Sequence, residues 1–572
     1  MEVLKGIPAS PGIAIGRAYT YVKELKVVDR GASGINVEKE LKRFKEALEK
    51  SRGQLVKIKD KTLRKLGQKE AEIFQAQFLM LEDPAFITEV ENRIKSGKSA
   101  ELSVQEVVKK FVATFDSMES PYFRERAADI RDVGERVIRN FKGEYQVSLA
   151  NIKEEVIIVA KALTPSDTAS LNPKKVLGFA TDLGGATSHT AIIARELGIP
   201  AVVGIGNVTE KVQHGDLVIV DGHKGLVLIN PDQETLNQYL GINLRVKKHL
   251  EELKSFSSVP AKTKDGHRVE VAANVGVLNE VEYALSYGAD GIGLLRTEFL
   301  YLNRNSLPTE EEQFEAYRSV AEKMGKKPVI IRTLDVGGDK PLPYLQIPEE
   351  TNPFLGWRAI RISLAKPDIF KTQLRAVLRA STYGNLKIMY PMIASLRELQ
   401  NANKILNEAK MELKSDGIPF NEKIEVGMMI ETPSAAIMAG LLAKEVSFFS
   451  VGTNDLTQYV LAVDRTNQNV SGLYDALHPA VLRLIKKTVN AAHAEGRWVG
   501  ICGELACDLV AIPILVGLGL DEFSMNPSSI PEAKKLIRSI SYSEAKEIAV
   551  KSLSLSEAEH VRKFVRNLYR LP

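Results

Sequence analysis

The chain has 572 residues, too many for one compact core, so we expect about three or four folding units, and its content of 44% apolar and 26% charged residues is ordinary for a soluble globular protein. The formal net charge of +5 is not gathered in a dense basic stretch, which argues against a nucleic-acid partner. The sequence has no apolar run long enough to span a membrane and no signal peptide, so we expect no membrane partner. Its only cysteines are Cys502 and Cys507, which excludes a disulfide framework and predicts a cytoplasmic protein.

The first quarter of the chain changes from strand-like to helical character. Residues 1 to about 20 hold short apolar runs broken by proline and glycine, which is typical of strands and turns. From about 36 to 141 these two residues become scarce and apolar residues recur three and four positions apart, which indicates amphipathic helices. Pro84, which follows Asp83, and Pro121 are predicted to begin helices.

Short β-branched runs return between about 150 and 230, with one helix expected from about Thr190 to Leu197. This pattern predicts a small α/β unit, which the first 20 residues can complete if the helical block is inserted between its two parts. A long, charged connecting helix is expected to follow it.

Apolar strands alternate with helices from about residue 265 onward. The strands are VEVAANVG, GIGLLRTEFL, PVIIRTLDVGG, LKIMYPMI, IEVGMMIET, VSFFSVGTND, RWVGICGE and EFSMNP. Eight such units in about 300 residues favour a (β/α)8 TIM barrel, and a doubly wound open sheet is the alternative. The predicted domains are an α/β domain at 1–20 and 145–230, an α-helical domain at 21–144, a linker helix at 231–262 and the barrel at 263–572.

Polar residues follow the predicted barrel strands, at the end where a βα barrel builds its active site. Arginines there suit an anionic substrate, because guanidinium groups match phosphate and carboxylate oxygens. Carboxylates suit a hard divalent cation. A ring of mutually neutralising salt bridges is the alternative interpretation. The residues are Asn274, Arg296, Glu298, Arg332, Asp335, Glu431, Asn454, Asp455, Cys502, Glu504 and Asn526.

A second candidate site is GGATSHTAIIARELGIP, at 184–200. Two glycines allow a tight turn, and His189 is then expected at the N-terminus of a helix, where free amides and the helix dipole favour an anion. Such a histidine can act as a nucleophile that carries a phosphoryl group, and a capping or core histidine is the alternative. Cys502 can exchange a proton at the barrel mouth or simply pack there.

These motifs resemble those of enzyme I of the bacterial sugar phosphotransferase system, a family of phosphoenolpyruvate-protein phosphotransferases. GGATSHTAIIAR resembles the phosphohistidine signature of phosphoenolpyruvate-utilising enzymes, and SFFSVGTNDLTQY, at 447–459, resembles their second signature. NPFLGWRAIR and the GGDK after the third barrel strand fit the same family, over the whole chain.

The resemblance implies a phosphohistidine mechanism. His189 would be the nucleophile, oriented by the hydroxyl of Thr168, and Cys502 would protonate the enolate to give pyruvate. Glu431 and Asp455 would hold Mg2+, with Mn2+ as the alternative metal. The phosphoenolpyruvate-binding residues would be Arg296, Arg332, Arg358, Asn454, Asp455 and Arg465.

The resemblance also implies two protein partners. The phosphoryl group would pass to the phosphocarrier protein HPr, docked on the helical domain, and the barrel would form a homodimer. Candidate docking residues are acidic, because complementary charge speeds encounter, although they can equally be a solvated helix face. They are Glu70, Glu72, Glu82 and Asp83.

Two other functions compete with this interpretation. A dikinase-like or synthase-like phosphoenolpyruvate enzyme would share the histidine unit and the barrel, but it needs an ATP-grasp domain, for which we find no segment before the helical block. A non-catalytic regulator that senses metabolites would keep the fold, but such proteins usually lose at least one catalytic group, and all of them are present here.

Overall fold

A computed structural model of the chain describes residues 1–572 with gaps at 22–34, 66–67, 117–120, 143–148, 150–151, 153, 165–166, 168–170, 173–174, 186–187, 303, 339–341, 343, 346–349, 468 and 570–572. It describes the backbone but not the side chains at 61–65, 68–73, 116, 121–128, 142, 189, 196 and 249–250. The chain divides into two compact units, Met1–Val246 and Lys247–Pro572, which we describe separately.

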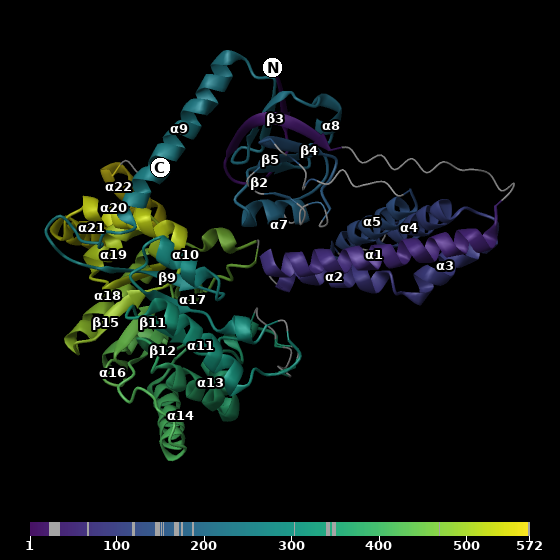
Figure 1. Ribbon diagram of the computed structural model, residues 1–572. Coiled ribbons are helices and arrows are strands. Elements are labelled where there is room, and N and C mark those ends of the chain that lie inside the picture. Colours follow the sequence, from purple (N-terminus) through teal and green to yellow (C-terminus); the bar gives the residue numbers. More distant parts are fainter. Residues whose placement is uncertain are drawn as a thin grey trace. The chain divides into compact units, whose positions relative to one another are not determined.

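The helical block of the first unit is a packed bundle (Figure 1). Its apolar stripes meet in one core that contains Phe44, Leu55, Leu81 and Val90. Asp83 caps α3 by accepting a hydrogen bond from the Ala85 amide at 2.7 Å, and a proline follows it as predicted. The helices are α1 (Val37–Lys65), α2 (Gln68–Met80), α3 (Pro84–Lys95), α4 (Ala100–Asp116) and α5 (Pro121–Lys142).

The α/β part of the first unit is one sheet built from both sides of the helical block. Its order is β1-β8-β7-β3-β4-β5-β6-β2, so strands from the first 21 residues pair with strands that follow residue 155. The predicted insertion of the helical block is therefore confirmed. The strands are β1 (Glu2–Lys5), β2 (Ile7–Ser10), β3 (Ile13–Tyr21), β4 (Val156–Ala160), β5 (Val176–Thr181), β6 (Ala201–Val203), β7 (Leu217–Asp221) and β8 (Leu226–Ile229). Helices α7 (His189–Glu196) and α8 (Val208–Lys211) accompany the sheet, and α9 (Gln233–Phe256) follows it.

Within the described part of the second unit, eight parallel strands close into a barrel, which confirms the barrel over the open sheet (Figure 1). The strands follow one another around the barrel in sequence order, and β16 pairs with β9 to close it. They are β9 (Glu270–Val275), β10 (Ile292–Leu295), β11 (Val329–Arg332), β12 (Leu386–Tyr390), β13 (Val426–Ile430), β14 (Phe448–Val451), β15 (Trp498–Ile501) and β16 (Glu522–Met525).

Helices surround this barrel, and several begin with strong local signals. Thr309 with Glu312 and Ser395 with Glu398 form capping boxes that satisfy the first amides of α11 and α14. The helices are α10 (Glu280–Ser286), α11 (Glu310–Met324), α12 (Ile360–Ala365), α13 (Pro367–Ala380), α14 (Leu396–Ser415), α15 (Pro433–Ile437), α16 (Ala439–Leu442), α17 (Thr453–Leu461), α18 (Pro479–Ala494), α19 (Ala511–Leu518), α20 (Ile530–Ser539), α21 (Tyr542–Ser554) and α22 (Ala558–Tyr569).

The interior of the barrel is filled by a layer of large side chains. Leu294, Ile330, Met389, Met429 and Phe448 come from successive strands and pack together, with Cys502 beside them. A filled interior is the normal state of an eight-stranded barrel. This layer separates the two ends of the barrel, and each end has its own cavity.

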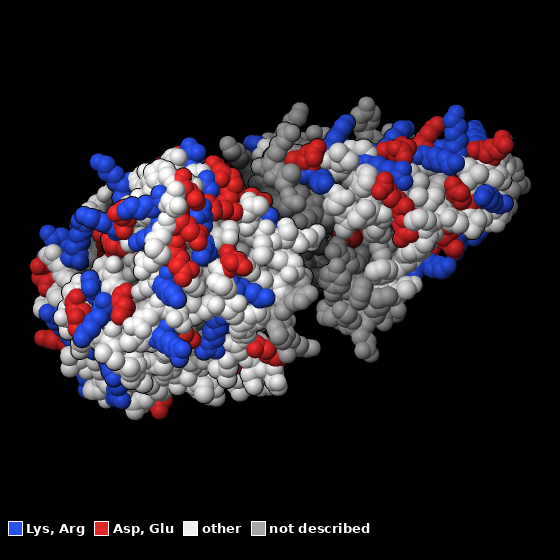
Figure 2. Space-filling view, turned by 90° about the horizontal axis from the view of Figure 1, so that it is seen from below, with Lys and Arg blue, Asp and Glu red and all other residues white. Residues whose placement is uncertain are grey.

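The surface carries charges of both signs. Basic and acidic side chains lie interspersed on the face shown in Figure 2. Many are paired, as are Arg375 and Arg379 of α13, which both contact Glu310. Among the described residues, no helix is long and apolar enough to cross a bilayer.

Close packing of α19 on α21 can be tested at Gly517. A Cβ added there would lie 1.9 Å from the carbonyl oxygen of Ala545, so Gly517→Ala must push the helices apart. We expect it to destabilise the barrel by about 1–3 kcal/mol. Gly440 of α16 is exposed with nothing within 4 Å of its added Cβ, so Gly440→Ala should stabilise by up to about 1 kcal/mol. Calorimetric melting of both variants tests this, and equal melting temperatures would contradict it.

Candidate active site

A cavity of about 260 Å3 opens at the carboxyl ends of the barrel strands. The loops that follow β10, β11, β13, β14 and β15 contribute its polar walls. Closing the barrel brings together side chains that are far apart in the chain, such as Arg296 and Glu504. Of the strand-exit residues predicted for this end of the barrel, Asn274, Glu298 and Asn526 do not line the cavity. The predicted residues that line it are Arg296, Arg332, Asp335, Arg358, Glu431, Asn454, Asp455, Arg465, Cys502 and Glu504.

Two of the arginines are buried and held by carboxylates. Arg332 pairs with Glu298 and with Asp335, whose Oδ2 lies 3.2 Å from its Nη1. Arg358 pairs with Asp335 at 3.2 Å and with Asp455 at 3.1 Å. Burial alone would lower the pKa of each guanidinium, but these carboxylates raise both pKa values above the usual range. Asp335 therefore fixes two positive charges side by side in the wall of the cavity.

The other two arginines are less constrained. Arg296 follows β10, is exposed and forms no ion pair with any residue that the structure describes. The Nη1 atom of Arg465 lies 3.9 Å from Asp455 Oδ1 and makes no hydrogen bond among the described groups. Both side chains line the cavity. Arg296 and Arg465 can therefore move to contact an anion that binds beside Arg332 and Arg358.

Glu431, at the end of β13, is a buried carboxyl group among other acids. Only 1% of it is exposed, and it accepts a hydrogen bond from the Met392 amide. Burial, with the nearby charges of Asp455 and Asp335, raises its pKa to about 8, although Arg332 and Arg358 act in the opposite direction. This crowding of carboxyl groups favours a cation at the same place.

The donors here fit a hard divalent ion. Glu431 and Asp455 offer carboxylate oxygens to one cavity. Mg2+ is usually bound through one or two carboxylates together with water and substrate phosphate oxygens. The pair therefore matches the mode of binding that a phosphorylated substrate would complete, and the family to which the motifs point implies a divalent metal in general.

Cys502 follows β15 and is 4% exposed, between the apolar layer and the cavity. Its Sγ donates to the Val451 carbonyl at 3.7 Å. Burial raises the pKa of the thiol to about 12, so it carries its proton at neutral pH. A protonated thiol at this position can donate a proton, whereas it is a poor nucleophile.

Asn454 ties two loops of the mouth together. Its Oδ1 accepts the Glu504 amide at 3.1 Å, and its Nδ2 donates to Glu504 Oε1 at 3.4 Å. The loop after β14 is thereby held to the loop after β15. Asn454 is half-buried and its side chain remains at the cavity wall.

Sequence reasoning did not show that two residues, Asp335 and Tyr459, position Arg358. Asp335 was recognised as a polar strand exit, but nothing in the sequence shows that two arginines share it. Tyr459 lies one helical turn after Asp455 on α17, and its hydroxyl contacts Arg358 at 3.5 Å and donates to the Phe354 carbonyl. The i, i+4 spacing within the second signature is a signal that could have identified it.

His189 is the first residue of α7, as predicted. The Ser188 hydroxyl caps this helix by accepting from the Ala191 amide at 3.4 Å, and Gly184 makes the preceding turn with φ of 123°. The side chain of His189 and the whole of Thr168 lie outside the described residues. So do the side chains of Glu70 and Glu72.

Glu82 and Asp83 are both exposed, at the turn between α2 and α3. The carboxylate of Asp83 already caps α3. Asp83 therefore stabilises the start of α3, whether or not it also contacts a partner protein.

Three family descriptions match the chain. They are the N-terminal part of phosphoenolpyruvate-utilising enzymes over residues 5–126, the mobile domain of these enzymes over 152–225, and their phosphoenolpyruvate-binding domain over 250–542.

Curated relatives match the chain over its full length. The phosphoenolpyruvate-protein phosphotransferase of Bacillus sp. (strain S) is 50% identical over 100% of this chain and 99% of the relative. That of Bacillus subtilis (strain 168) is 51% identical over 100% of both. A solution NMR structure of Enzyme I is 46% identical and covers 43% of this chain and 99% of that one, with a TM-score of 0.37.

The contribution of the buried ion pairs of Asp335 to stability can be compared with that of an exposed ion pair. Asp335→Asn leaves two buried guanidinium groups without their shared charge, which should destabilise the barrel by about 3–5 kcal/mol. Asp416 contacts Arg375 at 3.0 Å, a similar distance, but it is half exposed. Asp416→Asn should therefore change stability by less than about 1 kcal/mol. Urea unfolding measures both, and equally small effects would show that Asp335 is not needed to hold the arginines.

Proposed function

Because the chain belongs to the family of phosphoenolpyruvate-protein phosphotransferases, we propose that it transfers the phosphoryl group of phosphoenolpyruvate to His189 and then to a phosphocarrier protein, releasing pyruvate. The observation that supports this best is the barrel cavity, which brings together four arginines, four acidic side chains and a protonated thiol. Phosphoryl transfer requires positioning and charge neutralisation, and these groups supply both.

The arginines bind the substrate in this proposal. Arg332 and Arg358 are already oriented by Asp335, so they offer fixed donors to a phosphate or carboxylate without further ordering. Arg296 and Arg465 close on the anion from the less constrained side. Asn454 and Asp455 complete the substrate contacts.

We propose that Glu431 and Asp455 hold Mg2+, with Mn2+ as an alternative. When bound, such an ion withdraws electron density from the substrate oxygens and neutralises their charge. Glu431 is ionised in that state, because a cation offsets the burial and repulsion that otherwise raise its pKa.

The chemical step breaks the bond between phosphorus and the enol oxygen and forms one to the imidazole of His189, which Thr168 orients. The enolate left behind needs a proton at its terminal carbon to become pyruvate. Cys502 lines the cavity with its proton in place at neutral pH, and we assign it this donation. His189 must reach the barrel and later meet the acceptor, so the mechanism includes a hinged motion through 231–262.

We propose HPr as the acceptor, in the first step of sugar uptake phosphorylation in the cytoplasm. Its basic side chains would meet the acidic candidates Glu70, Glu72, Glu82 and Asp83 on the helical block. We also propose a homodimer formed through the barrel. The exposed apolar side chains of Ile437 at the end of α15, Leu441 on α16 and Met438 between these helices offer a surface for it.

Labelling tests the phosphohistidine directly. Wild-type protein incubated with Mg2+ and phosphoenolpyruvate that carries a labelled phosphoryl group should become labelled, whereas His189→Ala should not. The label should be lost in acid and kept in base, as a phosphohistidine is. Omitting the metal should abolish it. Label on both proteins would mean that another residue is the nucleophile, and label on neither would favour a non-catalytic regulator.

The two cysteines provide a matched test of proton donation. Cys502→Ala should slow pyruvate formation by about 100- to 10,000-fold, since it removes the general acid. Cys507 is half-buried and donates to the Glu504 carbonyl at 3.2 Å, without lining the cavity. Cys507→Ala should therefore keep the wild-type rate. Steady-state pyruvate release measures both, and full activity of Cys502→Ala would exclude it as the donor.

A further inference from the structure

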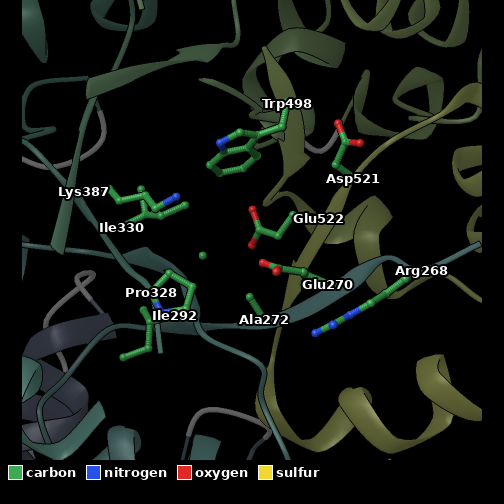
Figure 3. A pocket seen from close by; sticks show the side chains of 11 residues that line it. Arg268, Glu270, Ala272, Ile292, Pro328, Ile330, Lys387, Trp498, Asp521 and Glu522 are labelled. Carbon is green, nitrogen blue, oxygen red and sulfur yellow. The ribbon is translucent and has the colours of Figure 1, made fainter. Parts of the chain in front are cut away.

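A second cavity, of about 380 Å3, lies at the opposite end of the barrel (Figure 3). It is lined by residues near the amino ends of the strands, among them Glu270, Lys387, Trp498 and Glu522. Ile330 of the apolar layer forms part of its wall. The proposed phosphoryl chemistry at the barrel mouth uses none of these residues.

Glu522 is a buried acid without a partner. It is 4% exposed, and neither of its carboxyl oxygens has a hydrogen bond to any group that the structure describes. Gly293 and Gly500 make room for it, because a Cβ at either would lie 1.9 Å or 2.3 Å from one of those oxygens. Burying such a group unpaired is unfavourable, so its presence calls for an explanation. Figure 3 shows the carboxyl group directed into the cavity.

A second acid lies beside it. Glu270 is the register partner of Glu522 where β9 pairs with β16, and in Figure 3 both carboxyl groups face the same space. Burial, together with the charge of Glu270, raises the pKa of Glu522 to about 8, and Lys387 acts in the opposite direction. Among the described residues, neither acid forms an ion pair with a basic side chain.

The nearby basic groups do not pair with the two acids. Lys387 is bound to Glu425 at 2.9 Å and lies 4.8 Å from the centre of the Trp498 ring. Arg268, at the rim, forms no ion pair with either acid in the described structure. The space between the two acids is therefore suited to a positive group that comes from outside.

The apolar residues that line the rest of the cavity indicate which kind of cation it can bind. Ile292, Pro328 and Ile330 face the acids across the cavity, and Ala272 lies next to Glu270 on β9 (Figure 3). A bare metal ion gains nothing from apolar walls, whereas a primary amine with a hydrocarbon body can bury that body while its ammonium group contacts oxygen. We propose that this end of the barrel is a binding site for a small organic ammonium ion, held between Glu522 and Glu270.

Methyl NMR and calorimetric titration of the full chain with benzylamine test the proposal. Benzylamine should shift the methyl signals of Ile292 and Ile330, and Glu522→Gln should weaken its binding at least tenfold. Glu445→Gln is the matched control, since Glu445 is exposed just before β14, at the same end of the barrel, and should bind as the wild type does. Benzyl alcohol should bind at least tenfold more weakly.

Three results would overturn the proposal. Equal binding of benzyl alcohol would mean that the cavity recognises only the apolar body. Unchanged affinity of Glu522→Gln would show that the acid is not a ligand. The same methyl shifts on adding K+ alone would identify an inorganic cation site instead.

Melting curves without ligand provide an independent check. The raised pKa means that folding favours the protonated carboxyl group, so stability falls as pH rises from the unfolded pKa through the folded value of about 8. Glu522→Gln removes this loss. Its melting temperature should exceed that of the wild type at about pH 9, with the difference shrinking toward about pH 5. No difference at the higher pH would mean that Glu522 already has a partner.

Discussion

Closure of the barrel between β9 and β16 is the constraint on which both cavities depend. Parallel pairing around a closed ring places every strand's carboxyl end at one rim and every amino end at the other. Side chains from Arg296 to Glu504 meet at the first rim for this reason alone. The same closure brings Glu270, from the first strand, beside Glu522, from the last. An open sheet would have separated both sets.

At the mouth of the barrel, Asp335 forms ion pairs with two buried arginines, Arg332 and Arg358. These ion pairs offset the cost of burying the two charges and hold both side chains in place. Two guanidinium groups cannot be buried without compensation, and one carboxylate between them holds both in place. The binding groups are then ordered before substrate arrives, so less entropy is lost on binding. Arg296 and Arg465 are held less tightly, so their side chains can adjust their conformations to the substrate. The site thus combines a rigid half with an adaptable one.

Much of this was predictable from the sequence. Alternating apolar strands and helices predict the barrel, and polar residues at strand exits, such as Arg332 and Glu431, are predictable because every strand ends at the same rim. The pairing of Arg332 and Arg358 through Asp335 was not, since it depends on side-chain directions in separate loops. The cavity around Glu522 was hidden as well. It arises where Gly293 and Gly500, on two other strands, leave space that no local pattern reveals.

The inserted helical block has a consequence for a chain emerging from the ribosome. Glu2 pairs with Ile229 and Arg17 with Val156, so the earliest strands must wait for partners that are translated much later. The helical block is made of local contacts and can form in the interval. Until β8 appears, the nascent N-terminal strands expose unpaired edges, which are sites of association between neighbouring chains on a polysome. Fragments that end before residue 229 should therefore be more prone to aggregate than the complete chain.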